Sequence, residues 1–199
     1  DEYGTIIKLD DKNAILMSYY RNNVVHLFAI AAIVAAELTH SSKTSSEKVK
    51  QKVTNILPLL KNEMFITTED VDGYVDQILD YFAQNDIIEV SDDTLSIRNR
   101  SSLGSLQLSL LAKIMKDTLQ RYALAFNRIQ QVHGIQRSEL ESDCLKLAKR
   151  LLTLHDIKAP EYFDKKITSS FVSCIKEQKY VETDEACLMH LTDAGKATA

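Results

Sequence analysis

Residues Ala14–Leu38 read AILMSYYRNNVVHLFAIAAIVAAEL and form the longest apolar segment of the chain. No glycine or proline interrupts this segment, and its length and pattern favour a single long helix. Asp10 or Asp11 stands just before it, where a carboxylate can accept a free backbone N–H of the first turn. From Phe28 onward apolar residues occupy nearly every helical face, which is typical of a helix surrounded by other elements. We therefore predict one long buried helix around which the rest of the chain packs.

A polar cluster lies near the start of this helix, where Arg21 points away from a face shared by four hydrogen-bonding side chains. The three-and-four spacing places on that face Tyr19, Asn22, Asn23 and His26. Each of these groups would cost roughly 1–3 kcal/mol if it were buried without a hydrogen-bond partner. Two interpretations stay open: a satisfied network that ties the helix to the fold, or the border of a ligand pocket with Arg21 available to an anion.

The composition favours a mostly helical protein that can bury a core. The 199 residues are 45% hydrophobic and 26% charged, with only 5 glycines and 2 prolines. The formal net charge of -4 argues against a general nucleic-acid binder. The three cysteines lack CxxC spacing and fit reduced thiols of a cytosolic protein. The acidic start at Asp1 does not resemble a secretory signal, and we expect a fragment of something longer because no initiator Met is present.

The first unit after the long helix is predicted over residues 47–100, after a polar linker. Glu47–Leu60 is predicted as a helix that Pro58 kinks or stops. A second helix begins after a cap at Thr67 or Thr68. The segments IIEV and TLSI, separated by a Ser-Asp-Asp turn, then predict a β-hairpin. Two helices followed by a hairpin are typical of a small winged-helix-like unit.

A second unit is predicted over residues 101–199. One strong helix runs from Leu106 to about His133, and Gly134 ends it as a C′ glycine. Ser138, with a glutamate three residues later, has the spacing of a capping box and opens the next helix. A further helix ends near Lys179, and a strand, turn and strand follow. We expect a mainly α fold: a helical domain with two small winged-helix-like helix-plus-β-hairpin units.

Positive charge gathers between Arg98 and Arg137. This stretch contains seven basic residues and one acidic residue, Asp117, so it carries +6 while the remainder carries -10. Two interpretations stay open: a solvated helix face that meets the protein's own acidic surfaces, or a surface for anionic lipid head groups or acidic ligands. The candidate contact residues on the basic face of the predicted helix are Lys113, Lys116, Arg121 and Arg128.

The sequence contains no complete catalytic motif. It lacks GxGxxG, a P-loop, HExxH and GxSxG. The five histidines are scattered, and none is followed by an aspartate at the fifth position. We therefore predict no catalytic residue and no metal site in this chain.

Four stretches, in this order, resemble segments of one known family. They are LMSYYRNNVVHLFAIAAIVAA at Leu16–Ala36, ILPLLKNEMF at Ile56–Phe65, LQRYALAF at Leu119–Phe126, and RLLTLHDIKAPEYFDKKITSSFVSCIKEQKYV at Arg150–Val181. The family is that of the bacterial membrane-associated glycerol-3-phosphate acyltransferases. The first stretch resembles the segment that follows the catalytic core in these enzymes, and the last stretch is the most specific of the four.

The resemblance implies transfer of an acyl group from an acyl thioester to the 1-hydroxyl of glycerol 3-phosphate, the first step of phospholipid synthesis. The family uses a His-x-x-x-x-Asp pair, in which the histidine is the general base and the aspartate orients it. Because this chain lacks the pair, the resemblance implies a carboxy-terminal portion that supports the catalytic domain. It also implies an acyl-CoA or acyl carrier protein co-substrate and no cofactor. The expected location is peripheral, on the cytoplasmic face of the inner membrane, without a transmembrane helix in this chain.

The resemblance also suggests how the chain is divided. Residues 1–46 would pack the long helix on the upstream catalytic domain, the main partner. Residues 47–100 would form the first winged-helix-like unit, and residues 101–199 a helical subdomain that ends in a hairpin. The candidate substrate contacts are then Arg21, Asn22, Asn23 and His26, with Arg21 the best candidate for phosphate or the acyl donor.

The sequence has two alternative interpretations besides a portion of an acyltransferase. The first is a non-catalytic helical protein-interaction module. The second is a winged-helix nucleic-acid binder, which needs a basic recognition helix before the hairpin. The helix in that position carries Asp72, Asp76 and Asp80 but no lysine or arginine, so nucleic acid is not an expected partner.

Overall fold

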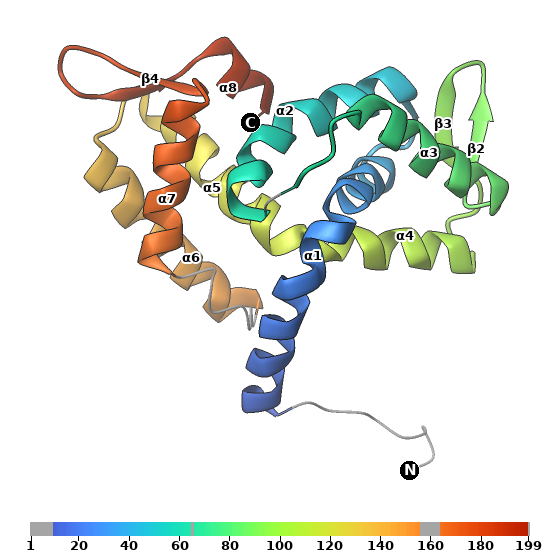
Figure 1. Cartoon of the computed structure of the whole chain (residues 1–199). Helices are drawn as coiled ribbons and strands as arrows, with labels where there is room; N and C mark the ends of the chain where they lie inside the picture. Colours follow the sequence, from blue (N-terminus) through green and yellow to red (C-terminus); the bar gives the residue numbers. More distant parts are fainter. Residues whose placement is uncertain (1–9, 65, 156–163, 199) are drawn as a thin grey trace.

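The computed structural model describes residues 10–64, 66–155 and 164–198, and it confirms a mainly helical protein (Figure 1). The strand predicted within residues 4–9 lies outside the described residues. The helices are α1 Asp11–His40, α2 Ser46–Met64, α3 Val71–Gln84, α4 Leu103–Ile114, α5 Lys116–Val132, α6 Arg137–His155, α7 Lys165–Glu177 and α8 Asp193–Thr198. The strands are β1 Thr44–Ser45, β2 Ile88–Ser91, β3 Thr94–Ile97, β4 Val181–Thr183 and β5 Met189–Leu191.

Helix α1 is the long helix that the sequence predicts, with 30 residues. The Asp10 carboxylate caps it, because the backbone N–H of Asn13 donates to Oδ1 at 2.8 Å. The second half packs into the core, where Ala29, Ala32 and Ala35 are fully buried. These small side chains let neighbouring helices approach closely, and α4 makes the most extensive contact with α1.

The prediction that α1 is buried along its whole length is wrong. Its first half extends away from the body of the fold (Figure 1). No other described element surrounds the helix there, so most of its side chains stay exposed. Val25 in this part of the helix is buried, but seven large apolar side chains between residues 16 and 28 are between 46% and 64% exposed. We call them the exposed α1 face: Leu16, Met17, Tyr19, Tyr20, Val24, Leu27 and Phe28.

One segment of α1, Asn23–His40, is long and apolar enough to cross a membrane, with 18 residues and a mean hydropathy of 1.5. This finding differs from the expectation that the chain contains no such helix. The core helix of a globular protein can have the same length and composition. Within this segment 44% is buried inside the protein, including Leu38 and the alanines that face α4.

The first hairpin unit forms as predicted, with three local differences. β2 and β3 pair antiparallel, and both turn residues, Asp92 and Asp93, adopt positive φ angles of 47° and 63°. Such angles suit a two-residue hairpin turn. The predicted linker contains β1, which pairs with β3 and gives the sheet order β1-β3-β2. Pro58 lies inside α2 without ending it, and Asp70 caps α3 instead of the predicted threonines.

The predicted helix from Leu106 to His133 is in fact two helices. α4 ends at Ile114 and α5 begins at Lys116, and Met115 between them is fully buried with φ -97° and ψ 0°. No glycine or proline marks this break in the sequence. At the far end of α5, the C-cap residue His133 takes the left-handed conformation with φ 51°, and Gly134 follows at the predicted C′ position with a positive φ of 131°.

The capping box predicted at Ser138 is wrong. α6 begins one residue earlier, and Glu141 forms an ion pair with the Arg137 side chain at 2.9 Å instead of capping the helix. The next helix and the C-terminal hairpin follow the prediction. Asp164 caps α7 by accepting from the Lys166 N–H at 2.7 Å, and β4 pairs antiparallel with β5.

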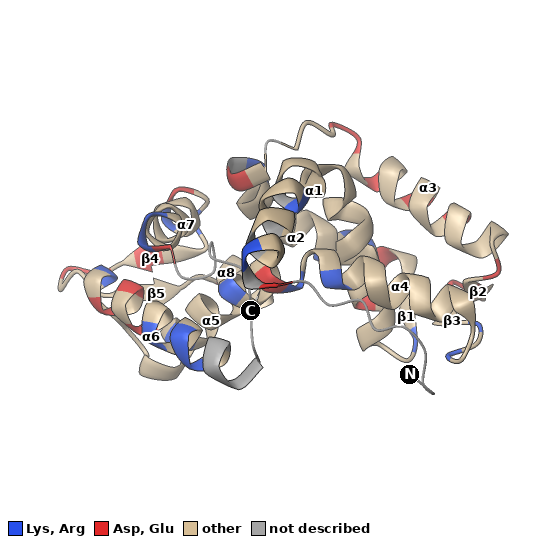
Figure 2. Ribbon diagram, turned by 90° about the horizontal axis from the view of Figure 1, so that it is seen from below, with Lys and Arg blue, Asp and Glu red and all other residues tan. Residues whose placement is uncertain are grey.

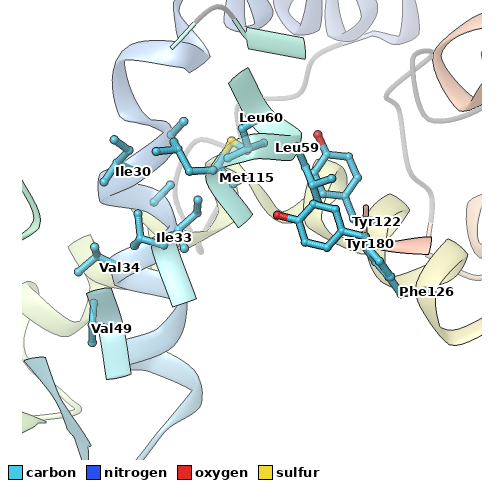
Figure 3. Close-up of a cluster of buried hydrophobic side chains, with 14 of the residues drawn as sticks. Ile30, Ile33, Val34, Val49, Leu59, Leu60, Met115, Tyr122, Phe126 and Tyr180 are labelled. Carbon is cyan, nitrogen blue, oxygen red and sulfur yellow. The ribbon is translucent and has the colours of Figure 1, made fainter. Parts of the chain in front are cut away.

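One hydrophobic cluster connects both hairpin units. Figure 3 shows side chains from α1, α2 and α5 in it, together with Tyr180 from the end of the chain. Tyr122 of α5 stacks on Phe171 of α7 with ring centroids 4.4 Å apart. The Tyr180 hydroxyl donates to the Asn55 carbonyl of α2 at 2.7 Å. The C-terminal hairpin is therefore held directly against the first unit.

Candidate functional site

The residues predicted as substrate contacts lie on the half of α1 that leaves the body of the fold. Tyr19, Asn23 and His26 are exposed, and the side chain of Asn22 lies outside the described part of the chain. Because exposed polar groups can bond to water, they need no buried network. The interpretation that this cluster ties α1 into the core is therefore wrong for the three described side chains. None of these three side chains lines the cleft between α1, α2, α4 and α5.

Arg21 differs from its neighbours because it contacts another helix. Its Nη1 lies 3.3 Å from Oδ2 of Asp117 in the first turn of α5. Both side chains are about one third exposed, at 35% and 27%. This ion pair connects the projecting half of α1, ten residues after the helix begins, to α5 in the body of the fold. Arg21 therefore already has a carboxylate partner, and an anionic substrate would have to compete with that partner.

A cleft of about 630 Å³ opens where the second half of α1 meets α2, α4 and α5. Apolar side chains, including Ile33, Ile56 and Leu119, form part of its wall. Three lysines line it, Lys52 together with two of the predicted basic residues, Lys113 and Lys116. The remaining polar side chains around the cleft are Glu37, Thr39, His40, Ser109 and Gln120. Ammonium groups over an apolar wall can accept an anion that carries a hydrocarbon part.

The four predicted basic residues do not form one exposed face. Lys113 and Lys116 are exposed, but Arg121 is only 6% exposed and pairs with Glu63 of α2. Arg128 pairs with Asp143 of α6, where Nη2 and Oδ2 are 2.7 Å apart. The predicted contact face is therefore wrong for the two arginines, because intramolecular carboxylates take up their charges. A contact with an anionic surface stays a prediction for the two lysines.

Arg121, Tyr122 and Glu63 form a polar cluster between α5 and α2, in which Arg121 and Tyr122 are buried. The Tyr122 hydroxyl donates to Oε2 of Glu63 at 2.6 Å, so one carboxylate serves both neighbours. Burial, and then the charge of Glu63, raise the pKa of Tyr122 far above its usual range. Nη1 of Arg121 is buried without a hydrogen-bond partner among the described residues. The tyrosine stays neutral, and the cluster stabilises the packing of α2 on α5.

The Arg128–Asp143 pair shows similar electrostatics nearer the surface. Burial disfavours the charged form of Asp143, but hydrogen bonds from Arg128 and Lys146 outweigh burial and lower its pKa. The neighbouring Cys144 thiol has its pKa raised to about 11 by burial and by the Asp143 charge. A thiol with that pKa is almost entirely protonated at neutral pH and is a poor nucleophile.

Sequence patterns identified neither the acidic partners nor the residues that line the cleft, apart from Lys113 and Lys116. Glu63, Asp117 and Asp143 bind the basic residues, yet they come from three different helices, so no local spacing could identify them. Lys52 and His40 were not singled out for the same reason. Within residues 10–64, 66–155 and 164–198, no three His, Cys, Asp or Glu side chains group to hold a metal ion.

Comparisons with known proteins give a consistent result. A family model described as the glycerol-3-phosphate acyltransferase C-terminal region matches residues 1–184. The chain is 40% identical over 181 residues to a glycerol-3-phosphate acyltransferase of Shewanella sp. (strain W3-18-1), covering 91% of this chain and 22% of that protein. It is 39% identical over 189 residues to the enzyme of that name from Pseudoalteromonas translucida (strain TAC 125), covering 95% and 23%. No solved structure matches the chain.

The relatives are much longer than this chain. The chain spans only 22% to 23% of the curated relatives described above. The similarity therefore concerns one region of a much longer protein.

Proposed function

This chain belongs to the family of glycerol-3-phosphate acyltransferase C-terminal regions, and we propose that it is the carboxy-terminal helical portion of such an enzyme. The whole enzyme would move a fatty acyl group from an acyl-CoA or acyl carrier protein thioester to the 1-hydroxyl of glycerol 3-phosphate. The match over residues 1–184 carries this proposal. The chain lacks the His-x-x-x-x-Asp pair, so the general base would lie in the catalytic domain of the same polypeptide.

The exposed α1 face is the proposed contact with that catalytic domain. Seven large apolar side chains on one projecting segment are more than a globular protein usually leaves in water. Three of them are aromatic, Tyr19, Tyr20 and Phe28, and aromatic residues are enriched in protein interfaces. The relatives contain more than enough further chain to cover this face. Docking there would bring the candidate substrate contacts Arg21, Asn22, Asn23 and His26 to the edge of the catalytic cleft.

The proposed domain division follows the same logic. Residues 1–46 would form the docking helix, residues 47–100 a winged-helix-like unit, and residues 101–199 the second helical unit. The order β1-α2-α3-β2-β3 and the sheet order β1-β3-β2 support the winged-helix-like description of the first unit. In the proposed enzyme both units would serve as a scaffold. The enzyme would act peripherally on the cytoplasmic face of the membrane that receives its product.

An acyltransferase assay tests the proposal directly. The 199-residue chain is assayed alone, then mixed with the upstream portion of the same protein, with acyl-CoA and glycerol 3-phosphate as substrates. We expect activity only after mixing. Activity of the chain alone would contradict the placement of the catalytic pair, and inactivity of two folded portions after mixing would favour the interaction-module alternative.

A substitution then tests the proposed substrate contact. Arg21→Ala in the full-length enzyme should raise KM for glycerol 3-phosphate, because a guanidinium is well suited to bind phosphate. Asp117→Asn is the matched control, since it also breaks the Arg21–Asp117 pair but keeps the guanidinium. If Arg21→Ala changed neither KM nor turnover, the contact would be disproved.

A further inference from the structure

Helix α4 has two different sides. One side packs on α1 and is buried, with Leu108 only 1% exposed. The other side carries Leu103, Leu106 and Leu110, which are 71%, 55% and 55% exposed. Their spacing of three and four residues places them in one row, which we call the leucine stripe. Three exposed leucines in one row of a 12-residue helix differ from apolar residues scattered singly over a surface.

Basic residues border the leucine stripe at both ends. Arg100 precedes it, and Lys113 follows Leu110 by three residues on the same face. Lys116 comes next, at the start of α5, and all three basic residues are exposed. No acidic residue occurs between Arg98 and Lys116, although the whole chain carries a net charge of -4. Figure 2 shows acidic positions along α3, whereas the sequence of α4 contains none.

We propose that the leucine stripe, with Arg100, Lys113 and Lys116, is a contact with an anionic lipid surface. A helix with an apolar face bounded by cations lies in the plane of a membrane interface, with its leucines in the boundary between head groups and acyl chains. The cations then lie among the lipid phosphates, where each contributes favourably. The inference deepens the proposed function and rests on it for the biological setting.

Two observations favour lipid over a protein partner at this site. Lysine is depleted in the cores of protein interfaces, whereas the stripe continues directly into Lys113. The leucine stripe also contains no aromatic residue, in contrast to the exposed α1 face that we assign to the catalytic domain. In Figure 1, α4 lies along the lower edge of its half of the molecule, with no described element below it.

Vesicle binding of the 199-residue chain tests the inference. Sedimentation is compared for vesicles of phosphatidylcholine alone and for vesicles that also contain phosphatidylglycerol. We expect binding to the anionic vesicles that weakens as salt is added. Leu106→Gln with Leu110→Gln should weaken this binding about tenfold or more, because two apolar side chains no longer enter the lipid. Lys113→Gln should weaken it about fivefold.

The matched control replaces two similarly exposed apolar residues that lie outside both α4 and the exposed α1 face, Tyr81→Gln with Val90→Gln, which are 61% and 55% exposed in the native chain. This control should bind vesicles like the native chain, and circular dichroism should show that all variants fold. Failure of the native chain to bind anionic vesicles would overturn the inference, as would equal loss in the control. So would a stripe variant that binds vesicles normally but no longer associates with the upstream portion. The assay contains no acyl donor, so its outcome is independent of acyl transfer.

Discussion

The two halves of α1 are both apolar, yet one is buried and the other is exposed. Between Ala29 and Leu38 the core-facing side chains include several alanines, and α4 packs directly against them. The first half instead carries leucines, tyrosines and a phenylalanine that no described element covers. Small side chains suit close contact between helices of the same domain, whereas large aromatic ones suit a separate partner. If the exposed α1 face docks on the catalytic domain as proposed, aromatic content distinguishes the two halves of this helix better than apolar content does.

The largest expected effect comes from truncating a leucine in each half. Leu38→Ala should lower the free energy of unfolding by about 2–5 kcal/mol, because this side chain is 1% exposed and its loss leaves a cavity. Leu27→Ala, at 62% exposure, should change it by less than about 0.5 kcal/mol. Urea unfolding of the 199-residue chain measures both. Equal effects would mean that the two halves do not differ in burial.

The next effect contrasts two ion pairs, one in the core and one at the projecting half. Glu63→Gln leaves the Arg121 charge buried and should destabilise the chain by about 2–4 kcal/mol, somewhat less than for a fully buried pair because Glu63 is 29% exposed. Asp117→Asn removes the partner of Arg21, which is 27% exposed, and should cost at most about 1 kcal/mol. Thermal and urea unfolding give both values. A larger loss from Asp117→Asn would reverse the contrast.

A smaller effect is expected at the exposed α1 face. Leu16→Gln with Tyr20→Gln should weaken association with the upstream portion roughly tenfold, or about 1.4 kcal/mol. The same pair should leave the unfolding free energy of the 199-residue chain nearly unchanged, since both side chains are already exposed. Titration calorimetry measures the association, with Tyr81→Gln on α3 as the control. Unchanged association would exclude this face as the docking surface.

The smallest effect should come from an exposed pair at the C-terminal hairpin. A hydrogen bond from His190, followed by the Leu188 N–H, lowers the pKa of Asp184. A carboxylate with a lowered folded pKa stabilises the protein above its unfolded pKa of about 3.9, and this contribution is lost as pH falls through the folded value. The native chain and Asp184→Asn should therefore differ slightly in stability near pH 5 and converge on further acidification. A difference that grew on acidification would contradict the assignment.

Sequence patterns predicted those features that depend on neighbouring residues. The capping carboxylate of Asp10 and the hairpin at Asp92 and Asp93 both depend on contacts within a few positions, and the structure confirms them. The exposure of the first half of α1 could not be predicted in this way. Periodicity shows that a helix face needs burial, but it does not show whether the partner belongs to the same domain.

Features that depend on distant residues were missed or mispredicted. The sequence has no glycine or proline at the break between α4 and α5. Tertiary packing around Met115, rather than local helix propensity, therefore ends α4 there. Arg121 was assigned to a solvated or lipid-facing surface because its charge was considered without Glu63, which is 58 residues away. The leucine stripe did have a local signal, three leucines spaced by three and four residues, but the predicted helix began at Leu106 and left Leu103 outside it, whereas α4 begins at Leu103.

The burial of Met115, between α4 and α5, affects how the surface of the molecule is connected to its core. Met115 is fully buried, so its side chain anchors the junction of the two helices in the core. α5 in turn holds Tyr122 against Phe171 and Arg121 against Glu63. The junction at Met115 therefore lies between the leucine stripe on the surface of α4 and the contacts that α5 makes in the core.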